Sequence, residues 1–111
     1  MKTLSLRQHN PRPAIHPADR VLLTKLLQPF LHPLQARLVL FGSRARGDAD
    51  IRSDLDLAIK APLPLPGDRM AAMREALEQS NIPYRVDLLD YATAPAALRA
   101  AIDDEGVEWT A

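Results

Sequence analysis

The segment from Asp54 to Lys60, DLDLAIK, carries a large apolar side chain at every second position. Successive side chains of a strand point to opposite faces of its sheet, so the two leucines and the isoleucine share one face. The acidic residues Asp54 and Asp56 share the other. The pattern predicts a strand with one buried face. Since a single strand cannot bury that face alone, the rest of the chain must supply partner strands and covering helices.

The remaining elements follow from periodicity and from the positions of proline and glycine. We expect a helix from Pro17 that Pro29 and Pro33 kink or end, helices at 68–80 and 95–105, strands at 36–41, 54–60 and 84–90, and a short final strand at 107–109. This order predicts an α/β or α+β fold, a small mixed sheet with helices packed on one face. Residues 1–16 contain Pro11 and Pro13 and are expected to form a flexible arm, with 17–111 as a single domain.

Composition excludes several functional classes. The chain has 111 residues and no cysteine, which excludes a disulfide framework, a zinc ribbon and a thiol nucleophile. Lys+Arg and Asp+Glu are both 14, so we expect no direct binding of nucleic acid. No apolar run approaches the ~18 residues of a membrane span. The N-terminus MKTLSLRQHNPRP has no apolar core of a secretory signal, and the expected location is the cytoplasm.

The neutral total conceals an uneven distribution of charge. Residues 1–46 carry eight basic residues and one acidic residue, a net charge of +7, and residues 47–111 carry six basic and thirteen acidic residues, a net charge of −7. Two interpretations are open. The halves could pack together and partly neutralise each other, or a basic surface could lie beside an acidic site that holds an anionic ligand with a metal ion.

Three motifs carry chemistry. Gly42-Ser43 ends a predicted buried strand, where a glycine lets the backbone approach a phosphate and exposed amides attract anions. Asp54 and Asp56 place two carboxylates on one face of a strand, and such like charges favour a divalent cation. Asp87 lies in the next strand pattern and completes a carboxylate triad if the two strands are neighbours; oxygen ligands of this kind suit Mg²⁺. The simpler interpretation of each motif is steric or that of a solvated strand face.

Other charged residues receive weaker predictions. Lys60, Arg52 and Arg85 are candidates for phosphate contacts, with solvated surface charges as the simpler interpretation. Asp90 falls on the face opposite Asp87 and is expected to cap the following turn. Trp109 is expected to pack on the domain or on a partner.

Together the motifs have a specific spacing. Asp54 follows Ser43 by eleven residues, and Asp87 follows Asp56 by thirty-one. The run GSRARGDADIRSDLDLAI resembles the signature of the nucleotidyltransferase superfamily related to DNA polymerase β. Over about residues 18–106 the chain is most similar to the minimal nucleotidyltransferases, several of which are antitoxins paired with HEPN-type ribonuclease toxins.

The resemblance implies a polymerase β palm-like fold and a role for each carboxylate. Asp54 and Asp56 match the pair that holds two Mg²⁺ ions. Asp87 matches the third carboxylate, which binds the catalytic metal and helps to activate the acceptor hydroxyl.

The resemblance also implies a nucleotide site. Gly42 and Ser43 match the turn that grips the triphosphate of ATP. Arg44 and Arg46 follow this turn and are candidates for phosphate contacts, although the family pattern does not fix that role.

These implications lead to a functional hypothesis. The chain is expected to be a Mg²⁺-dependent nucleotidyltransferase that moves AMP from ATP to a hydroxyl, expected to be a tyrosine, of a partner HEPN-type toxin. It would then act as an antitoxin by AMPylation. Two alternatives stay open: a non-catalytic antitoxin that neutralises its partner by forming a complex, and a nucleotidyltransferase acting on a small molecule.

Overall fold

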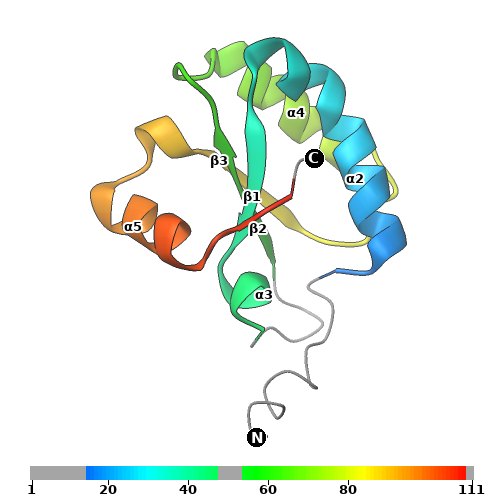
Figure 1. The fold of residues 1–111 in the computed structure, drawn as a ribbon. Helices are drawn as coiled ribbons and strands as arrows, with labels where there is room; N and C mark the ends of the chain where they lie inside the picture. Colours follow the sequence, from blue (N-terminus) through cyan, green and yellow to red (C-terminus); the bar gives the residue numbers. More distant parts are fainter. Residues whose placement is uncertain (1–14, 48–53, 110–111) are drawn as a thin grey trace, which may run out of the picture.

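A four-stranded mixed sheet forms the centre of the molecule (Figure 1). The computed structural model describes residues 15–47 and 54–109. The strands are β1 (Arg37–Phe41), β2 (Leu55–Lys60), β3 (Val86–Asp90) and β4 (Val107–Glu108), in the order β3-β2-β1-β4. Strand β1 pairs antiparallel with both β2 and β4, and β2 pairs parallel with β3. The predicted small mixed sheet is confirmed.

The helices are α2 (Pro17–Leu31), α3 (Ser43–Arg46), α4 (Gly67–Glu78) and α5 (Ala96–Glu105), with short 3₁₀ turns η1 (His32–Leu34) and η2 (Tyr91–Thr93). Helix α2 begins where the His16 ring nitrogen accepts a hydrogen bond from the Ala18 amide at 3.1 Å. It continues past Pro29 and ends before Pro33. The four-residue helix α3 was not among the predicted elements.

One face of the sheet packs against α2 and α4. Helix α2 contributes leucines four residues apart, Leu23, Leu27 and Leu31, which are fully buried. They meet the apolar face of β2 in one core cluster that also contains Met73 of α4. Side chains four residues apart line one helix face, so this spacing builds a continuous apolar stripe over the sheet.

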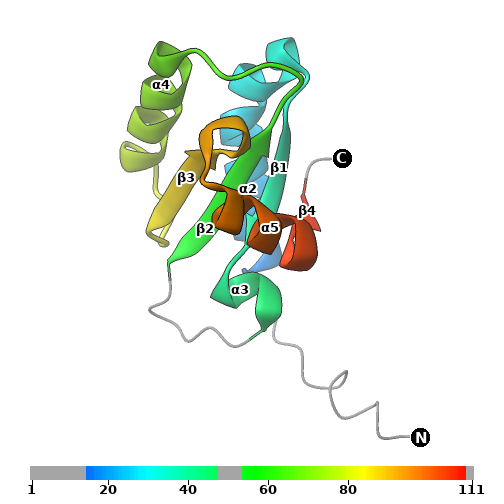
Figure 2. The ribbon, with the colours of Figure 1, turned by 90° about the vertical axis from the view of Figure 1, so that its left-hand side faces the viewer.

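The opposite face is covered by α5. Figure 2 shows α5 in front of the sheet and α2 behind it. Ile102 of α5 packs there with Val39 and Phe41 of β1 and with Ala58 of β2. The expectation that the helices share one face therefore needs a correction for α5. The physical reason is that β1 is apolar on both faces, and its second face also needs cover.

Both ends of the described chain join the core. Ile15 is 5% exposed, and Trp109 is 4% exposed with its amide bonded to the Leu38 carbonyl at 2.8 Å. The Arg20 guanidinium lies over the Trp109 ring at 5.1 Å. Ile15 and His16, which the sequence assigned to the arm, thus belong to the folded unit, while residues 1–14 lie outside the described residues. Among the helices described here, none has the length and apolarity to cross a membrane.

Candidate functional site

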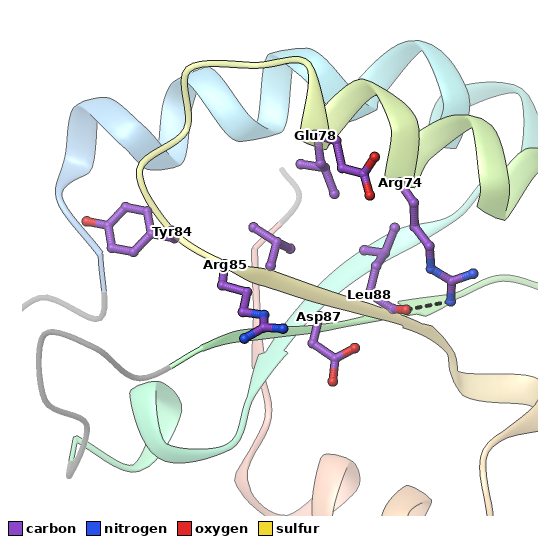
Figure 3. A pocket seen from close by; sticks show the side chains of 8 residues that line it. Arg74, Glu78, Tyr84, Arg85, Asp87 and Leu88 are labelled. Carbon is purple, nitrogen blue, oxygen red and sulfur yellow. Dashed lines mark hydrogen bonds between the residues drawn. The ribbon is translucent and has the colours of Figure 1, made fainter.

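The parallel pairing of β2 with β3 brings the acidic motifs together. In this register Asp56 and Asp87 are direct partners, so their side chains leave the sheet side by side on the same face. Asp54 lies two residues before Asp56, one step further along that face. Figure 3 shows Asp87 pointing away from the helix that carries Arg74 and Glu78. The three carboxylates therefore lie on the α5 side of the sheet, where β2 and β3 begin.

The Gly42 turn lies directly beside this cluster. Phe41, the last residue of β1, is paired with Asp56, so the chain turns into α3 next to that carboxylate. Gly42 has a φ of 78°, a conformation that side chains other than glycine rarely adopt. A Cβ at this position would collide with the Asp56 carboxylate. Gly42 is therefore required both by the turn and by its contact with the acidic cluster.

The charges of the cluster act on one another. Partial burial raises the pKa of Asp56 above its usual value, the nearby carboxylates of Asp87 and Asp54 raise it further, and the Arg46 guanidinium lowers it. The charged form of Asp56 is therefore less favourable in the folded protein than in water. A cation placed among these side chains would relieve that repulsion.

The donor set of this cluster fits magnesium. Carboxylate oxygens are the ligands that Mg²⁺ prefers, and the paired strands place Asp54, Asp56 and Asp87 on one face at one end of the sheet. Over residues 15–47 and 54–109, no three His, Cys, Asp or Glu side chains are arranged closely enough to hold a metal ion as they stand. The role of Asp54, Asp56 and Asp87 as metal ligands stays a prediction.

Glu105 is a residue of this site that the sequence did not predict. Its Oε1 accepts a hydrogen bond from the Gly42 amide at 3.2 Å and one from Arg46 Nη1 at 3.0 Å. It thereby ties both ends of α3 to the last turn of α5. Glu105 follows Asp103 and Asp104 in an acidic run, and nothing in this local pattern places α5 beside the Gly42 turn.

Arg44, the other basic candidate in the turn, lies against an aromatic ring. Its guanidinium is 4.8 Å from the centroid of the Tyr84 ring, and the Tyr84 hydroxyl accepts a hydrogen bond from the His16 amide at 3.3 Å. Arg44 and Arg46 thus both follow the turn in α3, and each has its own contact: Arg44 with the Tyr84 ring and Arg46 with Glu105. Ser43 is the first residue of α3 and directly follows Gly42.

The weaker candidates are distributed over the chain. Lys60 ends β2 far from Asp56; its Nζ lies 3.5 Å from Asp103 and 4.4 Å from the centroid of the Tyr91 ring. The structure thus does not bring Lys60 to the carboxylates. Arg85 precedes β3 two residues before Asp87, and Arg52 lies outside the described residues.

The predicted capping role of Asp90 is confirmed. Its side chain accepts hydrogen bonds from the Ala92 amide at 3.0 Å and from the Leu65 amide at 3.1 Å. Asp90 therefore fixes the turn after β3 and the loop before α4. It takes no part in the carboxylate cluster.

A groove of about 440 Å³ runs between α4 and β3 (Figure 3). Charged side chains from both elements line it, among them Arg74, Glu78, Arg85 and Asp87. Asp87 thus borders this groove through its place on β3, while its carboxylate points to the opposite, α5 face of the sheet.

Comparison with known proteins identifies relatives of this architecture. Residues 32–108 match the family described as "Polymerase beta, Nucleotidyltransferase". The chain is 47% identical over 62 residues to the "Probable protein adenylyltransferase MntA" of Haemophilus influenzae, a match covering 56% of this chain and 54% of that protein. The chain thus spans about half the length of this curated relative.

Solved structures show the same fold. A mutant of the toxin-antitoxin MntA-HpeT superposes with a TM-score of 0.67 at 25% identity, over 82% of this chain and 72% of the other. The "Structure of putative minimal nucleotidyltransferase" gives a TM-score of 0.61 at 27% identity, over 81% and 88% of the two chains. These matches confirm the predicted nucleotidyltransferase fold.

Proposed function

This chain belongs to the polymerase beta nucleotidyltransferase family, and we propose that it transfers AMP from ATP to a hydroxyl of a partner protein. One observation carries the proposal. The β2–β3 register pairs Asp56 with Asp87, and the Gly42 turn touches Asp56 from β1. Groups suited to a phosphate chain and to cations therefore meet at one end of the sheet.

In this account the Gly42-Ser43 turn binds the triphosphate through its backbone and through the start of α3. Arg46 contributes positive charge beside Asp56, whose pKa it lowers. Arg44 is held near the turn by the Tyr84 ring. These groups would orient the nucleotide and stabilise the negative charge of its phosphates.

Asp54, Asp56 and Asp87 are the residues that would hold Mg²⁺. Bound magnesium would supply positive charge to the oxygens that attack and leave in phosphoryl transfer. Asp87 has a further role, because a carboxylate beside the acceptor can take up the proton of its hydroxyl. The protein otherwise positions the reactants and contributes little covalent chemistry.

The partner is proposed from the relatives. The H. influenzae protein is called a probable protein adenylyltransferase, and the MntA-HpeT structure is described as that of a toxin-antitoxin mutant. We propose that this chain likewise acts as an antitoxin on a HEPN-type toxin in the cytoplasm, with a tyrosine as acceptor.

The test is transfer of label from ATP carrying ³²P at the α-phosphate to the purified HEPN-type toxin in the presence of Mg²⁺. Transfer is expected with the wild-type chain and is expected to be lost in Asp54→Asn and Asp56→Asn. Asp68→Asn, in the first turn of α4, is the matched control and should retain transfer. Toxin neutralisation that survives both active-site substitutions would contradict the enzyme and favour the non-catalytic antitoxin.

A further inference from the structure

Strand β3 lies at an edge of the sheet. In the order β3-β2-β1-β4 its partner among the described strands is β2, and the groove between β3 and α4 runs along its other side. An edge strand presents backbone groups that can pair with an added segment of chain. Asp87 connects this edge to the carboxylate cluster.

The order of the strands also separates the two reactants. The Gly42 turn follows β1, and β2 with Asp56 lies between β1 and β3. In phosphoryl transfer the attacking and leaving oxygens lie roughly in line on opposite sides of the phosphorus. If the turn holds the departing pyrophosphate on the β1 side, the acceptor must approach from the β3 side, at the outer edge of that strand.

We propose that the acceptor segment of the partner protein is an extended stretch of chain that pairs with the β3 edge beside the groove between α4 and β3. Because side chains of an added strand alternate between the two faces of the sheet, the residues next to the acceptor enter the groove and the acceptor hydroxyl reaches Asp87 on the α5 face. This inference rests on the proposed nucleotidyl transfer and names where the acceptor binds. A small alcohol would need only the space beside the Asp87 carboxylate on the α5 face. A polypeptide would fill the whole length of the groove, between the edge of β3 and the side chains of α4.

The walls of the groove suit such a segment. Its apolar floor includes Val86 and Leu88, and its rim carries both signs of charge, with Arg74 and Glu78 on α4. Arg74 Nη2 already donates to the Leu88 carbonyl at 2.9 Å. The docked segment therefore pairs with the β3 edge on the Val86 side of this bond, close to Asp87.

The chemical step in this arrangement is balanced. The acceptor oxygen forms a bond to the α-phosphorus of ATP. The bond from that phosphorus to the oxygen shared with the β-phosphorus breaks, and pyrophosphate leaves with the electron pair. The hydroxyl proton passes to a carboxylate oxygen of Asp87.

The absence of cysteine from the chain allows a direct test. Glu78→Cys places a thiol on the groove rim, and Glu75→Cys places one on the same helix outside the groove lining. Each variant is coupled to a bulky maleimide and assayed for ATP affinity and for AMP transfer to the purified HEPN-type toxin. The label at position 78 should reduce kcat/KM for the toxin by about tenfold or more, leaving the Kd for ATP within about twofold. The label at position 75 should change neither.

A photoreactive maleimide identifies the occupant. At position 78 it should cross-link to the toxin segment that contains the acceptor tyrosine, and at position 75 it should not. Undiminished AMP transfer with the maleimide at position 78 would overturn the assignment of the groove to the acceptor segment, and so would cross-linking there only to a second copy of this chain. In either case, AMP transfer by the unmodified protein would still support the proposed function. Absence of transfer by the unlabelled protein would overturn the proposed function, and the groove assignment with it.

Discussion

Gly42 joins the turn to the acidic cluster, and its role can be separated into two physical effects. Gly42 and Gly47 both have positive φ, 78° and 86°. A Cβ at Gly42 would collide with Asp56, whereas a Cβ at Gly47 would meet no atom of residues 15–47 and 54–109 within 4 Å. Substitution of Gly47 by alanine therefore tests the effect of backbone strain without the collision with Asp56.

Gly42→Ala should destabilise the protein more than Gly47→Ala. Backbone strain costs roughly 1–2 kcal/mol at either position, and the collision with Asp56 adds to it at Gly42. Urea unfolding of both variants measures the difference. Equal free energies of unfolding would show that Gly42 does not press against Asp56.

Asp56→Asn should stabilise the metal-free protein at neutral pH. The raised pKa of Asp56 means that its carboxylate is less favourable in the folded protein than in the unfolded chain. Solvent screening of this partly exposed group keeps the gain below about 1 kcal/mol. The same substitution should weaken the binding of Mg²⁺ with ATP.

The gain from Asp56→Asn should depend on pH with a definite sign. As the pH falls through the raised pKa towards 3.8, the folded wild-type protein takes up a proton before the unfolded chain does. Wild type thereby recovers stability, and its difference from Asp56→Asn shrinks. Urea unfolding at pH 7 and at about pH 4.5 measures the two differences. A difference that grows on acidification would contradict the raised pKa.

At the scale of the elements, periodicity predicted strands and helices well but could not predict their arrangement. The apolar alternation of β2 and the four-residue spacing in α2 arise from local geometry, so the sequence reports them directly. The pairing of β2 with β3 depends on long-range contacts that local patterns do not contain. The carboxylate triad could therefore be predicted only on the condition that these two strands are neighbours. Helix α3 was missed because a single turn has no periodicity to detect. The position of α5 was missed because its moderate apolar stripe does not say which face it covers.

Glu105 shows how an element contributes to the site from outside the motifs. Glu105→Ala removes the acceptor for Gly42 and Arg46, and α3 loses its tie to α5. We expect the Kd for ATP to rise about three- to tenfold, the scale of a partly exposed charged hydrogen bond. Glu105→Gln keeps an acceptor oxygen and should recover part of the affinity.

Glu108→Ala is the matched control for Glu105. Glu108 lies on β4, close in sequence to Glu105, and forms an ion pair at 2.9 Å with Arg37 of β1. Both side chains are about half exposed. The Kd for ATP should not change in this variant. Equal effects of the two alanine substitutions would show that Glu105 acts only on general stability.

For the molecule as a whole, the two oppositely charged halves of the sequence do pack together. The ion pairs Arg37–Glu108 and Arg46–Glu105 join the basic first half to the acidic second half. The first of the two interpretations of charge is therefore supported, and Arg46 beside Asp56 is compatible with the second as well.

Salt should change the stability of the whole molecule little. Exposed ion pairs contribute about 0–1 kcal/mol each, and salt also relieves repulsion within the carboxylate cluster. The free energy of unfolding should therefore change by less than about 1 kcal/mol between 0.1 and 1 M NaCl, as measured by urea titration. A loss of several kcal/mol would show that ion pairs dominate the packing of the halves.

The most direct test of the carboxylate site is paramagnetic broadening by Mn²⁺, which accepts the same oxygen ligands as Mg²⁺. Amide NMR signals are recorded during titration of the wild-type protein with Mn²⁺ and ATP. Broadening should appear together at Gly42, at Asp56 and at Asp87, from three separate elements, and should disappear when Mg²⁺ is added in excess. Broadening confined to the acidic residues near the C-terminus, or none at the paired strands, would contradict the account.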